Sequence, residues 1–289
     1  MTKQNLHNFL ETENNFKISD ILPVSGGSIN RAEKLETDRG IFFLKWNDSK
    51  PANMFDAEVH GLQLLTNKQD FIRIPEIIDY NGDENSVPGY LLMEYIEPYR
   101  GGNEAASEFG TNLARMHKIT SGQFGLERDN YIGSLPQSNT KHENWTEFFI
   151  RERIKPQLKT AIDSGKLNST DLKGWERLSS KLESIFPASK ASLLHGDLWG
   201  GNYFFDRNGK AVLIDPAVYY GHHEIELAFT KMFGGFSPGF YDSYAIEMEM
   251  TQGFQQRIPV YNLYPLLVHV NLFGGSYASQ ASSFLKSHL

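Results

Sequence analysis

The stretch Leu193-Leu194-His195-Gly196-Asp197-Leu198-Trp199-Gly200-Gly201-Asn202 joins an apolar pair to a His-x-Asp-x-x-x-x-Asn pattern. A second acid, Asp215, closes the apolar run that follows. Gly209-Lys210 lies between them and is typical of a hairpin turn, so we expect the chain to return Asp215 toward the first loop. Asp-rich turns also occur on solvated surfaces, but here apolar strands surround both halves. Converging carboxylate and amide oxygens suit a hard cation such as Mg²⁺.

This order of residues is typical of kinase chemistry. In kinases the first Asp of such a pattern orients the attacking hydroxyl, while the Asn and the second Asp hold the metal that bridges the nucleotide phosphates. The pattern therefore predicts Asp197 as the catalytic base. It predicts Asn202 and Asp215 as ligands of Mg²⁺ and ATP as the phosphoryl donor.

The composition permits such an enzyme and excludes several other classes. A chain of 289 residues with 40% hydrophobic and 22% charged residues is ordinary for one large or two modest globular domains. The net charge of −7 argues against a general nucleic-acid binder. The absence of cysteine excludes disulfides and thiolate catalysis. Residues 1–20 do not resemble a signal peptide and no apolar run is long enough to span a membrane, so we expect a cytoplasmic protein.

The first hundred residues are predicted to be rich in strands. Arg31–Glu36 and Ile41–Trp46 alternate like a hairpin behind the turn that contains Gly26, Gly27 and Ser28. Backbone N–H groups in such a turn can cradle phosphates, because small residues let the chain approach closely. Two adjacent glycines also fit an ordinary surface turn, so this assignment needs other support.

Lys45 gives that support. It shares a strand face with Ile41 and Phe43, and a lysine in so apolar a strand is costly unless its charge is paired. In the following helical segment Glu58 lies on the apolar stripe, where a core residue is expected. The two side chains are predicted to form the ion pair that holds a kinase lysine on the α- and β-phosphates. The alternative is that Lys45 extends to solvent and Glu58 lies at the stripe's edge.

Two further strands, Ile74–Tyr80 and Gly89–Ile96, lead into a polar connector. A strand that runs into a short connector is the hinge of a two-lobed kinase. Backbone groups of Met93, Glu94, Tyr95 and Ile96 are therefore expected to form hydrogen bonds with the adenine edge. The predicted fold is an α+β, protein-kinase-like fold: a small N-lobe with an antiparallel sheet and one helix, residues 1–96, and a larger helical C-lobe, residues 97–289.

Three features of the helical part have simple structural explanations. His117 lies on an apolar stripe and is expected to be a packed, hydrogen-bonded core residue. The basic segment with Arg151, Arg153 and Lys155 is most simply a solvated helix face. His222-His223-Glu224 has no second ligand cluster at zinc-like spacing.

Several motifs together resemble one family. The catalytic segment with Trp199 after Asp-Leu is similar to that of the fructosamine kinase, or ketosamine-3-kinase, family, whose relatives are aminoglycoside and choline kinases. Other matching segments, which cover the chain from about residue 20 almost to its end, are Pro23–Gly27, Met54–Glu58, Phe124–Leu126, Asp129–Gly133, Pro136–Asn139, Trp145, Asp215–His222 and Asn271–Gly275. The block from residue 124 to Trp145 makes the resemblance specific, because generic kinases lack it.

The resemblance implies ATP- and Mg²⁺-dependent phosphorylation of O3 of a ketosamine, a ribulosamine, erythrulosamine or fructosamine, on a small amine or a protein. The product would release the amine, which amounts to deglycation. Asp197 would be the base, Asn202 and Asp215 would bind metal, and Lys45 held by Glu58 would neutralise phosphate charge. Trp199 would stack on the sugar, unless it is a structural wedge.

Two positions depart from the family pattern. Ser28 stands where some relatives have a cysteine, which excludes redox-linked dimerisation through that residue. Glu226 precedes Leu-Ala where the family commonly has Asp, and we expect this acid to brace the catalytic loop.

Two other functions stay open on sequence. One is a kinase for an aminoglycoside or amino alcohol, although the block around residues 129–139 favours the ketosamine. The other is a pseudokinase that binds nucleotide or a partner, which is disfavoured because Lys45, Glu58, Asp197, Asn202 and Asp215 are all present. Oligomeric state, regulation, the preferred sugar and the choice between free and protein-bound substrate do not follow from the sequence.

Overall fold

The computed structural model describes residues 3–24, 30–47, 53–81 and 88–289. The predicted phosphate-binding residues Gly26, Gly27 and Ser28 lie outside the described residues. The chain divides into two compact units, Met1–Ala105 with Gly201–Pro216, and Ala106–Gly200 with Ala217–Leu289. The first unit thus includes the segment that carries Asn202 and Asp215, which the sequence-based boundary after residue 96 had assigned to the C-lobe. That boundary stays a prediction.

The first unit is built on one antiparallel sheet of order β1-β2-β3-β5-β4. The alternating segments of the sequence supply its strands, and the predicted hairpin is the pair β2·β3, closed at Thr37 and Gly40. The strands are β1 Ile18–Pro23, β2 Arg31–Thr37, β3 Gly40–Asn47, β4 Ile77–Asn81 and β5 Gly89–Glu94.

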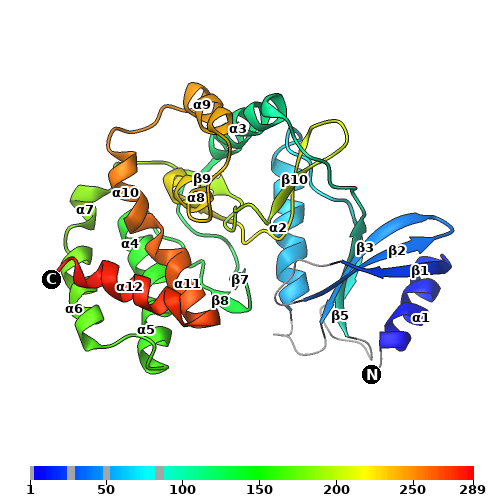
Figure 1. Ribbon diagram of the computed structural model, residues 1–289, viewed down its shortest axis with the longest axis horizontal. Coiled ribbons are helices and arrows are strands. Elements are labelled where there is room, and N and C mark those ends of the chain that lie inside the picture. Colours follow the sequence, from blue (N-terminus) through cyan, green and yellow to red (C-terminus); the bar gives the residue numbers. More distant parts are fainter. Residues whose placement is uncertain (1–2, 25–29, 48–52, 82–87) are drawn as a thin grey trace. The chain divides into compact units, whose positions relative to one another are not determined.

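Two helices cover the two faces of this sheet (Figure 1). Helix α1, Lys3–Asn14, packs Leu6 and Leu10 against one face, which includes Leu44 and Trp46. Helix α2, Met54–Lys68, packs against the other face, where Leu91 and Met93 lie. The sequence predicted α2 but only one helix in this part, so α1 is an addition. Lys45 follows the alternation that the sequence predicted.

A small hairpin completes the first unit. Strands β10, Tyr203–Phe205, and β11, Ala211–Leu213, pair antiparallel and form the hairpin that the sequence predicted. The backbone N–H of Asp206 donates to the carbonyl of Lys210 at 2.9 Å, and Gly209 adopts φ 77° in the turn. The Asp206 carboxylate also accepts a hydrogen bond from Arg73 at 2.7 Å. The turn between the two predicted metal ligands is therefore fixed at both ends.

The second unit is mainly helical, with short strand pairs between the helices. A three-stranded sheet of order β12-β9-β6 and the hairpin β7·β8 hold its loops. The strands are β6 Thr120–Ser121, β7 Asn130–Ile132, β8 Leu135–Gln137, β9 Ala191–Leu194 and β12 Tyr219–Gly221. The helices are α3 Asn103–His117, which begins in the first unit, α4 Trp145–Phe148, a π-helical stretch Phe149–Ile154, α5 Lys155–Asp163, α6 Ser169–Ser179, α7 Leu182–Ile185, α8 His223–Thr230, α9 Pro238–Glu247, α10 Phe254–Tyr261, α11 Leu263–Phe273 and α12 Ser276–Lys286.

One expectation for this unit was wrong. Arg153 lies in the π-helical stretch and is fully buried, whereas the sequence suggested a solvated face. Its guanidinium donates to the carbonyl of Ser138 at 2.6 Å and to Oδ1 of Asn139 at 2.7 Å. It also stacks at 3.9 Å on the ring of Tyr219. An arginine amid polar neighbours in sequence carries no signal that its partners are a backbone oxygen and a side-chain oxygen about 15 residues away.

The expectation for His117 is confirmed. Its ring is fully buried and lies between the Tyr244 hydroxyl, at 2.7 Å from Nδ1, and the Glu226 carboxylate, at 2.9 Å from Nε2. In the His-His-Glu segment, both carboxylate oxygens of Glu224 form an ion pair with the Arg257 guanidinium, with N–O distances of 2.6 and 2.7 Å. No helix among the described residues is long and apolar enough to cross a membrane.

The buried pair His222 and His223 predicts a loss of stability in mild acid. Burial lowers the pKa of His222 to about 3 and that of His223 to about 2. Below pH 6.5 the unfolded chain therefore binds protons that the folded chain does not, and stability falls as the pH falls. Between pH 6.5 and 5 we expect the free energy of unfolding to drop by about 3 kcal/mol for the pair.

Urea denaturation across this pH range checks the expectation. His223→Met should roughly halve the slope, because it removes one of the two titrating groups. A slope that does not respond to His223→Met would mean that other groups cause the acid sensitivity.

Candidate active site

Lys45 forms the centre of a charged triad in the first unit. Its Nζ lies 2.8 Å from Oε1 of Glu58 on α2 and 2.6 Å from Oδ1 of Asp215. Burial lowers the pKa of Lys45, but Asp215 and Glu58 outweigh it and leave the pKa well above its usual value. Burial raises the pKa of Glu58 despite the opposing effect of Lys45. The predicted pair of Lys45 and Glu58 is thus present, and Asp215 shares the lysine.

Asn202 and Asp215 flank the β10·β11 hairpin and lie on joined backbone segments. The N–H of Ile214, next to Asp215, donates to the carbonyl of Asn202 at 3.1 Å. Asn202 is buried, whereas the Asp215 side chain is 39% exposed. Asp215 has φ 56°, a conformation that is costly for a residue with a side chain and often marks a functional site.

These two residues fit a magnesium ion in the type of donor they offer. One amide oxygen and one carboxylate are hard ligands, and Mg²⁺ is commonly bound by one or two protein groups with phosphate oxygens and water. No cluster of three or more His, Cys, Asp or Glu side chains arranged for a metal occurs in the described ranges. A site of this kind therefore depends on the nucleotide for further ligands.

The predicted hinge follows β5. Met93 lies within the sheet, opposite Phe43 on β3 and Ile77 on β4, so its backbone is part of the ladder. The N–H of Glu94 donates to the carbonyl of Glu76 at 2.8 Å, and that of Tyr95 donates to the carbonyl of Ile41 at 3.4 Å. The Glu94 carboxylate also forms an ion pair with Arg73. The end of the strand is thus rigidly placed.

Asp197 lies in the second unit, on the loop after β9. Gly196 precedes it with φ 86°, and a Cβ atom at Gly196 would lie 2.0 Å from the carbonyl oxygen of Ala217. Only glycine fits there. The N–H of Asp197 donates to Nδ1 of the buried His195 at 3.3 Å. The carbonyl of His195 in turn accepts from the N–H of Ala217 at 2.9 Å, so the loop is fixed on both sides of Asp197.

Glu226 of α8 braces this loop, as the sequence suggested. Its carboxylate accepts the N–H of Gly196 at 2.6 Å and that of His195 at 3.1 Å, besides the hydrogen bond with His117. Burial raises the pKa of Glu226, but the hydrogen bond and charge of His117, the charge of His195 and the N–H of Gly196 outweigh it. The pKa lies below its usual value and the group stays ionised.

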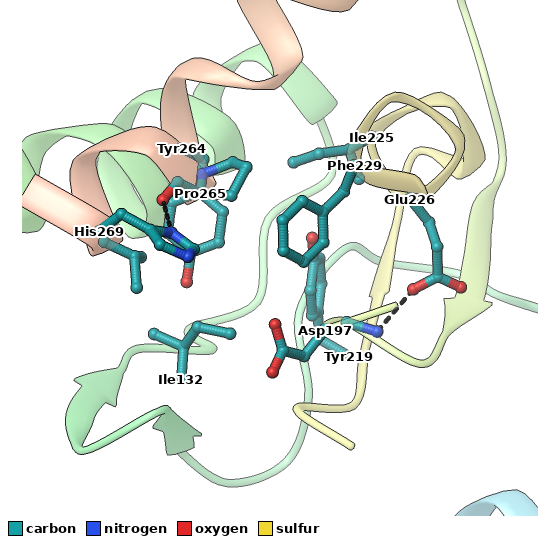
Figure 2. Close-up of a pocket in the computed structure, with 11 residues that line it drawn as sticks. Ile132, Asp197, Tyr219, Ile225, Glu226, Phe229, Tyr264, Pro265 and His269 are labelled. Atoms are coloured by element: carbon teal, nitrogen blue, oxygen red, sulfur yellow. Dashed lines mark hydrogen bonds between the residues drawn. The ribbon is translucent and has the colours of Figure 1, made fainter. Parts of the chain in front are cut away.

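Asp197 points into a pocket within the second unit (Figure 2). Figure 2 shows Asp197 and Tyr219 on one side and Ile132, Tyr264 and His269 on the other. The hollow measures about 390 Å³, including space open to solvent. Its lining residues are Ile132, Gly196, Asp197, Tyr219, Ile225, Glu226, Phe229, Tyr264, Pro265, Val268 and His269. The wall is mostly apolar and aromatic and carries two carboxylates, of which Glu226 already accepts backbone hydrogen bonds from His195 and Gly196.

The block from residue 124 to Trp145 supports this pocket through buried amides. Gln137 donates to Oδ1 of Asn130 at 2.7 Å and to the carbonyl of Ala217 at 3.1 Å, while Asn130 donates to the carbonyl of Val218 at 2.8 Å. The Tyr264 hydroxyl donates to Oε1 of Gln137 at 2.6 Å. Sequence reasoning found this block only through the resemblance, because buried amide contacts leave no periodic pattern. It did not find Tyr264 or His269 as pocket residues.

Trp199 lies two residues after Asp197 and is 37% exposed. Its ring meets that of Phe233 edge-on, with centroids 5.9 Å apart. The indole is thus accessible on the loop that carries Asp197, and its predicted stacking on the sugar stays a prediction.

Comparison with known proteins decides the family. A family model described as fructosamine kinase matches residues 1–289. The chain belongs to the fructosamine kinase family. It is 39% identical to a probable ketoamine kinase from Enterococcus faecium, over 92% of this chain and 94% of that protein. It is 38% identical to the chloroplastic protein-ribulosamine 3-kinase of Arabidopsis thaliana, over 94% of this chain and 83% of that protein.

Solved structures agree with this family assignment. A fructosamine-3-kinase homologue from Thermobifida fusca aligns with a TM-score of 0.88 at 28% identity and covers 99% of both chains. The aminoglycoside phosphotransferase APH(4)-Ia aligns with a TM-score of 0.61 at 15% identity over 99% of both chains, which shows the shared fold alone. The predicted family, the kinase-like α+β fold and the class of enzyme, a kinase that phosphorylates a ketosamine hydroxyl, are confirmed.

Proposed function

We propose that this fructosamine kinase family member transfers the γ-phosphoryl group of ATP to the O3 hydroxyl of a ketosamine, free or attached to a protein. The observation that carries the proposal is the carboxylate of Asp197 at the wall of a mostly apolar pocket. An ionised acid within hydrogen-bond reach of a hydroxyl orients it and accepts its proton. The relatives named ketoamine kinase and protein-ribulosamine 3-kinase support this substrate class.

Lys45 would bind the phosphates in this scheme. Its ion pairs with Glu58 and Asp215 keep the ammonium charged and in place before a nucleotide arrives. A fixed positive charge offsets the charge that develops on the transferred phosphoryl group. Glu58 would hold the lysine in place, so that Asp215 would be available as a ligand of the metal. Backbone N–H groups of the turn with Gly26, Gly27 and Ser28 would cover the phosphates.

Asn202 and Asp215 would hold Mg²⁺, which when bound would neutralise the β- and γ-phosphate oxygens. Met93, Glu94, Tyr95 and Ile96 would form the adenine site. Because the N–H groups of Glu94 and Tyr95 already have partners at 2.8 and 3.4 Å, we assign the adenine contacts to the remaining backbone groups at the end of β5.

Trp199 would stack on the sugar with its exposed indole. A phosphate on O3 becomes allylic once the ketosamine enolises toward its amine carbon, so elimination of the phosphate can release the amine. The activity would therefore reverse early sugar damage on lysines or small amines. A cytoplasmic site of action stays a prediction.

The proposal is tested by a substrate panel with ATP and Mg²⁺. We expect phosphorylation of one or more of ribulose-, erythrulose- and fructose-modified lysine, with the position of the phosphate assigned by NMR. Kanamycin and choline serve as the alternative acceptors. Turnover of these two alone would place the protein with the aminoglycoside and choline kinases in activity, and binding of ATP without any turnover would support a binding protein.

A further inference from the structure

His269 of α11 is a polar group in the pocket wall to which the reaction described above assigns no role. It lies across the pocket from Asp197, next to Ile132 and Tyr264 (Figure 2). Its Nδ1 lies 2.7 Å from the carbonyl oxygen of Pro265, one helical turn earlier. The imidazole is therefore held by its own helix through Nδ1, and this contact does not involve Nε2.

This hydrogen bond fixes which nitrogen carries the proton. A carbonyl oxygen can only accept, so Nδ1 must donate its hydrogen, and in the neutral ring Nε2 keeps a lone pair. Burial lowers the pKa of His269, against a smaller opposing effect of the Pro265 carbonyl, so the ring is neutral at pH 7. Nε2 has no hydrogen-bond partner within the part of the chain that the structure describes. His269 thus offers an acceptor to whatever enters the pocket.

Aromatic rings surround this acceptor. The ring centroids of Phe233 and Tyr277 lie 5.1 and 5.0 Å from that of His269, and the centroid of Phe273 lies at 5.6 Å. Phe233 is 42% exposed and also meets Trp199 on the catalytic loop. Aromatic faces attract cations. A neutral acceptor among such rings suits a group that is positively charged and carries N–H donors.

The carboxylates that line the pocket are Asp197 and Glu226. Glu226 is committed to the backbone N–H groups of His195 and Gly196. Asp197 is committed to the reacting hydroxyl under the proposed function. A cationic amine in the pocket therefore has no spare carboxylate among the lining residues.

We propose that His269 is a specificity-determining residue whose Nε2 accepts a hydrogen bond from the protonated secondary amine of the ketosamine. This inference rests on the proposed function, which brings O3 of the sugar to Asp197. The amine is carried on C1 of the same short chain, so a substrate that reacts at O3 holds its nitrogen close to the reacting end. The contact would distinguish a ketosamine from a free ketose or a neutral ketose ether.

The test compares the ketosamine of the panel that the wild type phosphorylates best with its neutral analogue, in which an ether oxygen replaces the amine nitrogen. His269→Phe keeps an aromatic ring beside Phe233 and Tyr277 but removes Nε2. We expect it to raise KM for the ketosamine by roughly tenfold or more, as for loss of a hydrogen bond to a charged group, with kcat little changed. KM for the ether should stay the same.

Two further variants separate recognition from packing. His269→Gln carries an acceptor near the position of Nε2 and should recover part of the preference for the amine. His288→Phe makes the same exchange at a histidine outside the pocket lining and should behave as wild type. Equal losses on both substrates, or a loss in kcat alone, would overturn the assignment of His269. A wild-type enzyme that phosphorylates none of the ribulose-, erythrulose- and fructose-modified lysines would instead overturn the proposed function.

Discussion

Asp197→Asn is expected to lower kcat by roughly a thousandfold, since a positioned base contributes between a hundredfold and ten-thousandfold in such reactions. The amide keeps the size of the side chain but cannot accept the proton of the attacking hydroxyl. The loop itself should persist, because Gly196 and His195 are fixed by backbone hydrogen bonds to Ala217 and Glu226. Steady-state kinetics with the preferred ketosamine measure the loss.

Controls for ATP binding and for stability separate a loss of catalysis in Asp197→Asn from a loss of folding. The dissociation constant for ATP and the melting temperature should match those of the wild type, because the residues proposed to bind the nucleotide lie in the first unit and Asp197 in the second. Asp163→Asn changes an exposed acid on α5 in the same way and should leave kcat unchanged. Retention of more than a tenth of the wild-type kcat in Asp197→Asn would show that another group takes the proton.

The ion pair of Lys45 and Glu58 could be predicted from the sequence because each of the two residues breaks a local pattern. Lys45 interrupts an apolar strand face, and Glu58 interrupts the apolar stripe of a helix. Two such violations close together predict an ion pair, and the structure has it at 2.8 Å. The ladder β2·β3·β5 followed from alternation in the same way. Helix α1 was not predicted, because its sequence contains few apolar residues.

The pocket around Asp197 was harder to predict, because the contacts that build it are long-range. Arg153 looks like a surface residue between polar neighbours, yet its partners Ser138 and Asn139 lie in a loop some way back along the chain. Tyr264 and His269 sit in an apolar helix, where a sequence pattern indicates only burial. What they face is decided by the packing of α11 against the pocket, which no local periodicity encodes. Asp197, the predicted catalytic base, was assigned from its motif alone.

Glu226→Gln is expected to weaken both folding and catalysis. The carboxylate accepts three hydrogen bonds, from His117 and from the N–H groups of His195 and Gly196, and it is fully buried. An amide has one oxygen, so at least one of these buried donors loses its acceptor, at a cost of about 1–3 kcal/mol. Because the loop then shifts, we expect kcat to fall by roughly a hundredfold with little change in KM for ATP. Thermal unfolding and kinetics measure the two effects.

Glu226→Asp is the informative companion, because it keeps the charge and both oxygens while it shortens the side chain. If Glu226 acts by positioning the loop, this variant should recover most of the stability and part of kcat. Since the acid lies behind the loop and contacts Asp197 only through the backbone of its neighbours, the pH profile of kcat should keep its shape in both variants. A shifted profile would instead show that Glu226 exchanges a proton during turnover, which would contradict a positioning role.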